Sequence, residues 1–120
     1  SYVGQQSDNT KLYNLTVSNS GTASSSPVYI DCDVEINDLD ISNWNSQNAI
    51  IVGSGKATIV DSTFTGDNAV LLYGGNTTIA DTSFDGKNSI NVNNGAEAHL
   101  TRVTDSNNDG TYSVKNSGTL

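Results

Sequence analysis

The sequence predicts an all-β chain that winds as a right-handed parallel β-helix of about five coils, each with 20–24 residues and three short strands. Part of the sequence is an internal repeat, in which one block matches the next position by position. The apolar residues alternate in short runs, and Gly, Ser, Thr, Asn and Asp separate these runs. One column accommodates all 120 residues, so we expect a single domain over 1–120, with an irregular lead-in over 1–10.

The repeat is clearest in two adjacent blocks, 56–75 and 76–95, which align without a gap and carry similar residues at most inward positions. The same phase continues in both directions through Leu12, Ile36, Ile59, Ile79, Leu100 and Leu120. Because a coil of about 20 residues cannot enclose a core by itself, successive coils must stack with their strands parallel. An antiparallel sandwich also has short alternating strands, but these have different neighbours and no reason to repeat.

Each period contains three short segments whose alternate residues we expect to face inward. The first segments supply the inward pairs Val34/Ile36, Ala57/Ile59, Thr77/Ile79 and Ala98/Leu100. The second supply Leu15/Val17, Leu39/Ile41, Ser62/Phe64, Thr82/Phe84 and Val103, and the third supply Val28/Ile30, Ile50/Val52, Val70/Leu72, Ile90/Val92 and Tyr112/Val114. This stacking places Phe64 over Phe84, whereas Asp105 breaks the apolar row without an evident reason.

Two corners of the coil carry residues that tolerate left-handed backbone. Just before the third strand come Asn48, Asn68 and Asn88, whose amides are expected to hydrogen-bond from coil to coil as an asparagine ladder. The next corner carries Gly55, Gly75, Gly95 and Gly118, with Asp33 in the earliest coil. We expect a positive φ angle at each of these glycines.

A third corner, after the first strand, is acidic. It carries Asp38, Asp61 and Asp81, with Asn14 before them and Arg102 after them. Carboxylates stacked about 4.8 Å apart repel one another and favour a cation, so these aspartates are weak candidates for a calcium site. The default interpretation is a solvated acidic ridge, because the glycine-rich nonapeptide of calcium-binding β-rolls is absent from the sequence. We therefore predict no bound metal and no cofactor.

Composition argues against several classes of function. With 13 acidic and 5 basic residues, the chain has a formal charge of −8 and is not expected to bind nucleic acid. No apolar run reaches the roughly 18 residues of a membrane span, so we expect no direct membrane insertion of this segment. The single cysteine, Cys32, lies in an alternating run and is expected to be buried as a small apolar side chain.

The residues needed for catalysis do not come together in the sequence. Cleavage of a polyuronate requires a base beside paired carboxylates or calcium. The basic residues are scattered, and the one histidine, His99, has no cysteine or serine partner at a motif spacing. We expect a non-enzymatic protein.

The corner between the second and third strands is longest in the early coils, at 18–27 and 43–47. Irregular loops on a regular column are common places for binding. Trp44 lies in the second loop, and Tyr29, Ile51 and Leu71 face outward beside it in consecutive coils. These four residues form a candidate surface for a ligand or for self-association. Alternatively, Trp44 folds over its own corner and other segments of the parent protein cover the row.

The run Ala57-Thr-Ile-Val-Asp-Ser-Thr-Phe-Thr-Gly66, followed by Asn68-Ala-Val-Leu-Leu-Tyr-Gly-Gly75, resembles the coils of pertactin and related autotransporter passenger domains. The resemblance covers roughly residues 34–104, and pectate-lyase-like enzymes and phage tailspikes share the same packing pattern. It implies a Gram-negative protein that is secreted or held at the outer membrane and acts in adhesion, autoaggregation or immune evasion. The sequence contains neither the family's barrel nor an Arg-Gly-Asp tripeptide, so we expect a piece of a passenger.

These features favour an adhesin-type segment that binds a host surface protein, a glycan or a second copy of itself. The alternative is a pectate-lyase-like β-helix that binds or cleaves polysaccharide, with Trp44 or Tyr73 as a stacking platform. A groove with convergent acids and a base would favour this alternative. Because the ends of the column would expose unpaired strands, we also expect the chain to continue or to associate end to end.

Overall fold

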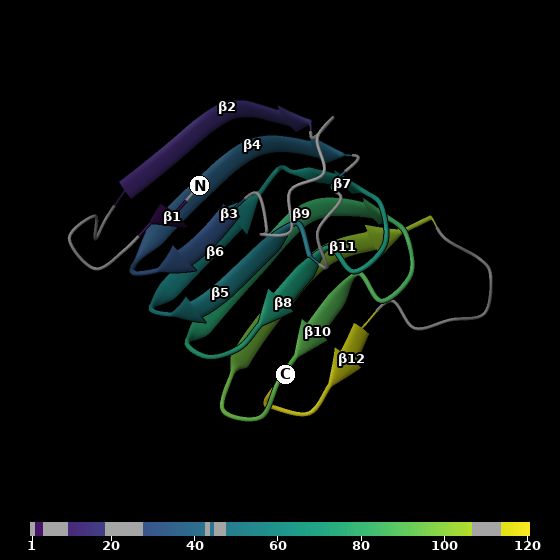
Figure 1. The fold of residues 1–120 in the computed structure, drawn as a ribbon. Coiled ribbons are helices and arrows are strands. Elements are labelled where there is room, and N and C mark those ends of the chain that lie inside the picture. The colour runs from purple at the N-terminus through teal and green to yellow at the C-terminus, as the bar shows by residue number, and fades with distance from the viewer. Residues whose placement is uncertain (1, 4–9, 19–27, 43, 45–47, 107–113) are drawn as a thin grey trace.

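The computed structural model of the chain describes residues 2–3, 10–18, 28–42, 44, 48–106 and 114–120, with side chains from Val28 onward. These residues contain no helix and form a parallel β-solenoid of about four turns. Figure 1 shows the strands stacked along the column, with β2 at one end and β12 at the other. The all-β prediction and the prediction of stacked parallel strands are confirmed.

One sheet contains six parallel strands in the order β1-β3-β5-β8-β10-β12. Its strands are β1 (Tyr2–Val3), β3 (Val28–Asp31), β5 (Ile50–Ser54), β8 (Val70–Leu72), β10 (Ile90–Val92) and β12 (Val114–Asn116). We call it sheet A. It consists of the predicted third segments, together with β1, which lies within the segment expected to be an irregular lead-in.

The other sheet, sheet B, contains β2 (Thr10–Ser18), β4 (Val34–Ser42), β6 (Lys56–Val60), β7 (Thr63–Thr65), β9 (Asn76–Asp85) and β11 (Glu97–Asp105). Its order is β11-β9-β6-β4-β2, and β7 pairs with β4 and β9. The sequence predicts separate first and second strands in every coil, but β4, β9 and β11 each run through both segments. A single left-handed residue at the corner bends these strands and leaves the pairing on either side in register.

The predicted register is confirmed in the middle of the column. Ile59 pairs with Ile36 and Ile79, and Phe64 pairs with Ile41 and Phe84. Inward positions along these strands are buried and outward positions are exposed or partly exposed, as the alternation predicts. Paired residues of neighbouring turns therefore point to the same face of the sheet, so each inward position contributes to one continuous row.

The predicted register is wrong in the last turn. Val114 pairs with Ile90, whereas the sequence predicts Tyr112 at that place and Val114 beside Val92. The connection that precedes β12 is therefore longer than predicted, and Tyr112 lies outside the described residues. Leu120 is likewise out of phase with Leu100, because the adjacent Thr119 pairs with Glu97.

The core runs through the column between the two sheets. Ile36, Ile59 and Ile79 are fully buried, as are Val52 and Leu72 from sheet A. Cys32 is also buried, as predicted, with 2% of its surface exposed. A continuous apolar interior of this kind supplies the main stabilisation of each turn, because every turn covers the apolar surface of the next.

The glycine corner is confirmed in three turns and corrected at its two ends. Gly55, Gly75 and Gly95 have φ angles of 86°, 75° and 93°. Gly118 does not have a positive φ; it is needed for space, because a Cβ atom there would meet the carbonyl oxygens of Asn93 and Ala96. In the first turn Cys32, not Asp33, occupies the place of Gly55. Its backbone lies against that glycine, while Asp33 Oδ1 accepts a hydrogen bond of 2.9 Å from the Lys56 amide.

The break at Asp105 has a structural explanation. In the pairing of β9 and β11, Asp105 lies opposite Phe84, at the end of an otherwise apolar row. Its carboxylate turns to the neighbouring corner, where Oδ2 accepts a hydrogen bond of 2.8 Å from Ser89 Oγ and Oδ1 accepts one of 3.5 Å from the Gly86 amide. The acid therefore accepts hydrogen bonds from the preceding turn that an apolar side chain could not accept.

Candidate functional site

The acidic corner lies where the sequence predicts it, at the bend of sheet B. Asp38, Asp61, Asp81 and Arg102 have φ angles of 58°, 52°, 51° and 49°. Aspartate tolerates this left-handed backbone because its short side chain can hydrogen-bond locally. The four residues occupy equivalent corners in successive turns, and all of them are exposed. Their common role is therefore to turn the strand.

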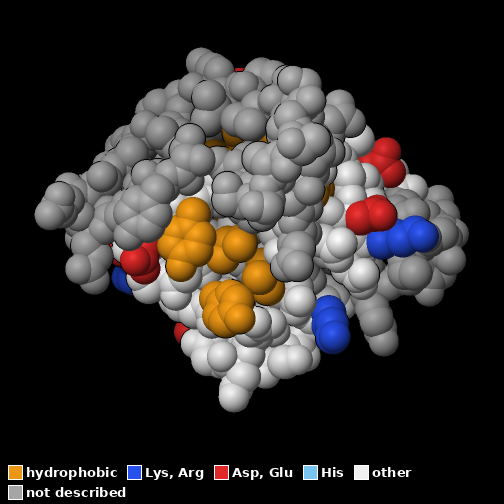
Figure 2. Space-filling view, viewed as in Figure 1, with side chains coloured by type: hydrophobic (Ala, Val, Ile, Leu, Met, Phe, Trp, Pro, Cys, Tyr) orange, Lys and Arg blue, Asp and Glu red, His pale blue; other side chains and the backbone are white. Residues whose placement is uncertain are grey.

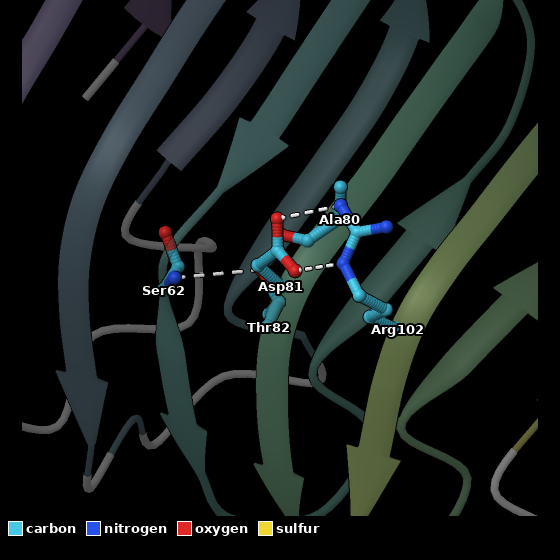
Figure 3. A network of polar contacts seen from close by, with 5 residues as sticks. All are labelled: Ser62, Ala80, Asp81, Thr82 and Arg102. Atoms are coloured by element: carbon cyan, nitrogen blue, oxygen red, sulfur yellow. Dashed lines mark hydrogen bonds and ion pairs between the residues drawn. The ribbon is translucent and has the colours of Figure 1, made fainter.

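Arg102 neutralises the acidic corner at its last turn (Figure 3). Its guanidinium group makes two hydrogen bonds to the Asp81 carboxylate, of which the bond from Nη2 to Oδ2 measures 2.9 Å. This hydrogen bonding lowers the pKa of Asp81 and raises the pKa of Arg102. Since both side chains are exposed to water, the pair is screened and contributes little to stability.

Buried hydroxyl groups hydrogen-bond to main-chain groups next to this corner, as Figure 3 shows for Ser62 and Thr82. Thr82 Oγ1 donates to the Ala80 carbonyl over 2.8 Å and accepts from the Ser62 amide over 3.4 Å. Ser62 Oγ repeats the pattern one turn earlier, donating to Val60 and accepting from Leu39. The sequence predicts these two positions only as inward-facing; their hydroxyls replace the ladder bonds that the bend interrupts.

The weak calcium candidates do not form a cluster. In the described part of the chain, no group of three or more His, Cys, Asp or Glu side chains is placed to hold a metal ion. Asp81 is paired with Arg102. The acidic corner is thus a bend with one ion pair at its end.

The candidate binding residues of sheet A form one outward row. Tyr29 pairs with Ile51, Ile51 with Leu71, and the row continues to Asn91 and Lys115. We call these five residues the outer row. Tyr29 is 37% exposed, and Ile51 and Leu71 are partly exposed. Figure 2 shows apolar side chains gathered on this face, over the strands of sheet A.

Two tyrosines extend the apolar part of the outer row. Tyr73 follows Leu71 by two residues, directly after the end of β8, and is 62% exposed. The phenol of Tyr29 lies over Gly53, where an added Cβ would approach Tyr29 Oη to 2.6 Å. Gly53 thus provides the space in which the Tyr29 ring lies along the sheet.

Trp44 lies apart from the outer row, on a corner. Its indole Nε1 donates a hydrogen bond of 2.9 Å to the Asp67 carbonyl, and its ring covers Gly66. The side chain is partly buried against the core. The sequence offers two interpretations, a binding residue or a cover for its own corner; the structure shows Trp44 covering the corner of the next turn.

The asparagine corner borders a hollow beside the outer row. Asn48, Asn68, Leu71 and Asn91 line this hollow, which has a volume of about 340 Å³; we call it the asparagine hollow. Asn48 is buried, and its Nδ2 donates to the main-chain carbonyl of Asn68 over 3.1 Å. At this step the hydrogen bond of the predicted asparagine ladder therefore runs from the side chain of Asn48 to the main chain of Asn68. Asn68 and Asn88 adopt the expected left-handed backbone, with φ angles of 56° and 50°.

A second polar hollow, of about 260 Å³, lies on the outward face of sheet B beside His99. His99 Nε2 is 2.9 Å from Glu97 Oε1, and both side chains are about half exposed. The hollow is also lined by Lys56, Thr58 and Thr78. Within the described ranges, His99 makes no hydrogen bond to either threonine, so this pair has no hydroxyl nucleophile in hydrogen-bonding contact.

A third hollow opens between the last two turns. It has a volume of about 410 Å³ and is lined mainly by core side chains, namely Phe84, Ile90, Leu100, Val103 and Val114, together with Ser89, Arg102 and Asp105. The last-turn residues Leu100, Val103 and Val114 are only partly buried, whereas Phe84 and Ile90 in the preceding turn are buried. Among the described residues, this hollow therefore lies at the C-terminal end of the core.

The chain matches no family model, no curated protein and no solved structure. The resemblance to autotransporter passenger domains consequently stays a prediction from the sequence. Among the described residues, no helix has the length and apolarity needed for a membrane span.

Tyr29, Ile51 and Leu71 are neighbours on sheet A, as the sequence predicts. Trp44 lies at a corner of the coil, in the loop where the sequence places it. Sequence reasoning missed Asn91, which continues the outer row and lines the asparagine hollow. The signal was present, because Asn91 is the counterpart of Leu71 in the second block of the repeat.

Proposed function

We propose that this chain is a non-enzymatic segment of an exported adhesin-type surface protein, built as a right-handed parallel β-helix of about five coils. Its partners are a host surface protein or glycan, or a second copy of itself. It acts at the surface of a Gram-negative bacterium, held at the outer membrane or secreted. The resemblance of its repeat to passenger-domain coils supports the cellular setting.

The observation that carries the binding function is the outer row. Tyr29, Ile51 and Leu71 present partly exposed apolar side chains from three adjacent strands of a regular sheet. Contiguous apolar rows on a protein surface are typical of interaction sites. Main-chain pairing on both sides holds β5 and β8, so the row is rigid and loses little entropy when it binds.

A polysaccharide-active β-helix is the second candidate, and the exposed ring of Tyr73 favours its binding form over its cleaving form. Cleavage requires an acid and a base that converge on one substrate bond. The exposed His99–Glu97 pair lies on sheet B, and the outer row lies on sheet A. A ligand on the outer row would therefore not meet this pair.

The test is a binding screen of the chain against extracellular-matrix proteins, glycans and itself. Leu71→Ser removes an apolar side chain from the outer row, and Val60→Ser makes a similar change at a partly exposed outward position of sheet B. We expect Leu71→Ser, but not Val60→Ser, to weaken binding by about 10-fold or more. Trp44→Ala, run in parallel, reports whether the corner belongs to the surface. Absence of any binding partner, or equal loss in the two serine variants, would overturn the proposal.

A further inference from the structure

We infer that the asparagine hollow and the ring of Tyr73 together form a binding site for an uncharged carbohydrate chain. This inference rests on the proposed function, because it names the ligand class of the same face of sheet A. The site combines an exposed aromatic ring, two free amide groups and a lining without charge. Neutral sugars present the matching chemistry, an apolar C–H face with hydroxyl groups around it.

The aromatic platform is Tyr73. Its ring is 62% exposed, and Tyr73 follows the hollow-lining Leu71 by two residues, one residue beyond the end of β8. Two residues of extended chain span about 7 Å. A tyrosine ring offers a rigid apolar face and a polar tip. A sugar ring that stacks on Tyr73 would thus extend toward Leu71 and the hollow.

The amide groups are those of Asn68 and Asn91. Asn68 is exposed and Asn91 partly exposed, and within the described residues neither side chain has a hydrogen-bond partner. Each amide offers two donor hydrogens and an acceptor oxygen, which suits hydroxyl groups that both donate and accept. Asn48 is different, because its Nδ2 already donates to the Asn68 carbonyl and supports the wall of the hollow.

Charge selects the class of carbohydrate. All four residues that line the asparagine hollow are uncharged, and the chain as a whole carries a formal charge of −8. Asp67, next to Asn68, accepts a hydrogen bond of 2.8 Å from the Lys87 amide, so this corner carries one acidic and one basic residue. Lys115 pairs with Asn91 but does not line the hollow, so the lining itself supplies no cation to bind a sulfate or uronate and suits an uncharged chain better.

The site is held in place before a ligand arrives. The Tyr73 amide donates to the Val52 carbonyl over 2.9 Å, and the Asn93 amide donates to the Leu72 carbonyl over 2.9 Å. These bonds fix the end of β8 to the turns on both sides. The backbone of Asn68 is fixed in the same way, since its main-chain N–H donates to the Lys87 carbonyl over 2.8 Å. A preorganised surface of this kind loses little conformational entropy on binding.

The experiment applies the chain to an array of neutral hexose and N-acetylhexosamine oligosaccharides, with sulfated and uronate-containing oligosaccharides on the same array. The best neutral ligand is then titrated by calorimetry into the chain and its variants. We expect Tyr73→Ala to weaken binding by about 10-fold and Asn91→Ala by about 5-fold. Tyr73→Phe keeps the ring and is expected to retain binding within about 3-fold. Val60→Ser on sheet B is the control and should bind as the unmodified chain does.

Three results would overturn the inference: no binding of any neutral oligosaccharide, stronger binding of sulfated or uronate oligosaccharides, or binding that Tyr73→Ala and Asn91→Ala leave unchanged. The first result would leave the proposed function standing if a protein ligand or a second copy still bound through Leu71. Circular dichroism of each variant shows whether the fold is intact, and Tyr73→Phe and Val60→Ser provide folded comparisons.

Discussion

The ring of Phe64 lies over the ring of Phe84 in the next turn, with the centroids 4.9 Å apart and the planes 10° apart. This separation equals the spacing of paired strands, so the stack follows from the parallel register. Phe64 is fully buried. The two rings therefore join consecutive turns through the core, and the stack offers a direct test of the fold.

Replacing Phe64 with alanine should lower the free energy of unfolding by about 3–5 kcal/mol, because it leaves a cavity and removes the stack. Phe64→Leu, which keeps most of the volume, should cost less than half as much. Urea unfolding followed by circular dichroism measures both values. Equal and small losses in the two variants would contradict the stacked register.

Thr77 and Thr82 should respond in opposite ways to replacement by valine. Both are buried inward-facing threonines, but among the described residues Thr77 Oγ1 has no hydrogen-bond partner, whereas Thr82 Oγ1 bonds to Ala80 and Ser62. Thr77→Val removes an unsatisfied hydroxyl and should stabilise the chain by about 1 kcal/mol. Thr82→Val leaves polar backbone groups unpaired and should destabilise it by about 1–3 kcal/mol. The two variants serve as mutual controls in one set of unfolding curves, and shifts of the same sign would refute the assignment.

The Asp81–Arg102 pair should make stability weakly dependent on pH. Hydrogen bonding to Arg102 lowers the pKa of Asp81 from its ordinary value of 3.8. The ionised carboxylate is therefore favoured by folding, and its contribution is present above about pH 4 and lost as the pH falls through the lowered pKa.

Arg102→Gln should raise the pKa of Asp81 toward its ordinary value, as measured by NMR titration of the carboxyl carbon. The stability difference between this variant and the unmodified chain should shrink at acid pH and in high salt. Lys115→Gln, which changes an exposed cation on sheet A, controls for the loss of one positive charge. An Asp81 pKa that is the same with and without Arg102 would exclude the ion pair in solution.

Trp44 reports on the corner that it covers, because it is the only tryptophan in the chain. A Cβ atom at Gly66 would approach the indole ring to 2.9 Å, so Gly66→Ala should displace the ring toward water. We expect a red shift of the fluorescence emission and easier quenching by acrylamide. Gly95→Ala is the matched control, since Gly95 also has a positive φ but a Cβ there would meet no atom of the described residues within 4 Å. Identical spectra for the two variants would place Trp44 elsewhere.

The middle turns could be predicted from the sequence because their length is constant. Where successive turns are equally long, as from Ile59 to Ile79, identical phase fixes the register and the inward face together. The last turn could not be predicted in this way, since the connection between Ile90 and its partner Val114 is longer than in the two turns directly before it. A longer connection shifts the register without leaving a trace in the apolar alternation. The same shift explains why Gly118 is not equivalent to Gly95.

In the candidate site, too, the placement of residues within strands could be predicted from the sequence, whereas the contacts made at the corners could not. Alternation within β3, β5 and β8 was sufficient to place Tyr29, Ile51 and Leu71 on one outward row. The position of Trp44 over Gly66 depends on a side-chain hydrogen bond to a corner carbonyl of the next turn, and periodicity carries no information about such a bond. The asparagine hollow could not be foreseen for a similar reason, because it depends on how the corner and the outer row meet in space.

The identical pairing of 56–75 with 76–95 also bears on how such a chain arises and changes. Lys56 pairs with Asn76, and Phe64 with Phe84, so the offset between the two blocks is the same at both ends of the sheet B segment. A tandem duplication of this unit in the gene would insert a whole turn and preserve the register, the corners and the core on both sides. The length of the column can therefore change in discrete steps without refolding of what is already there, so evolution can adjust the reach of the surface separately from its chemistry.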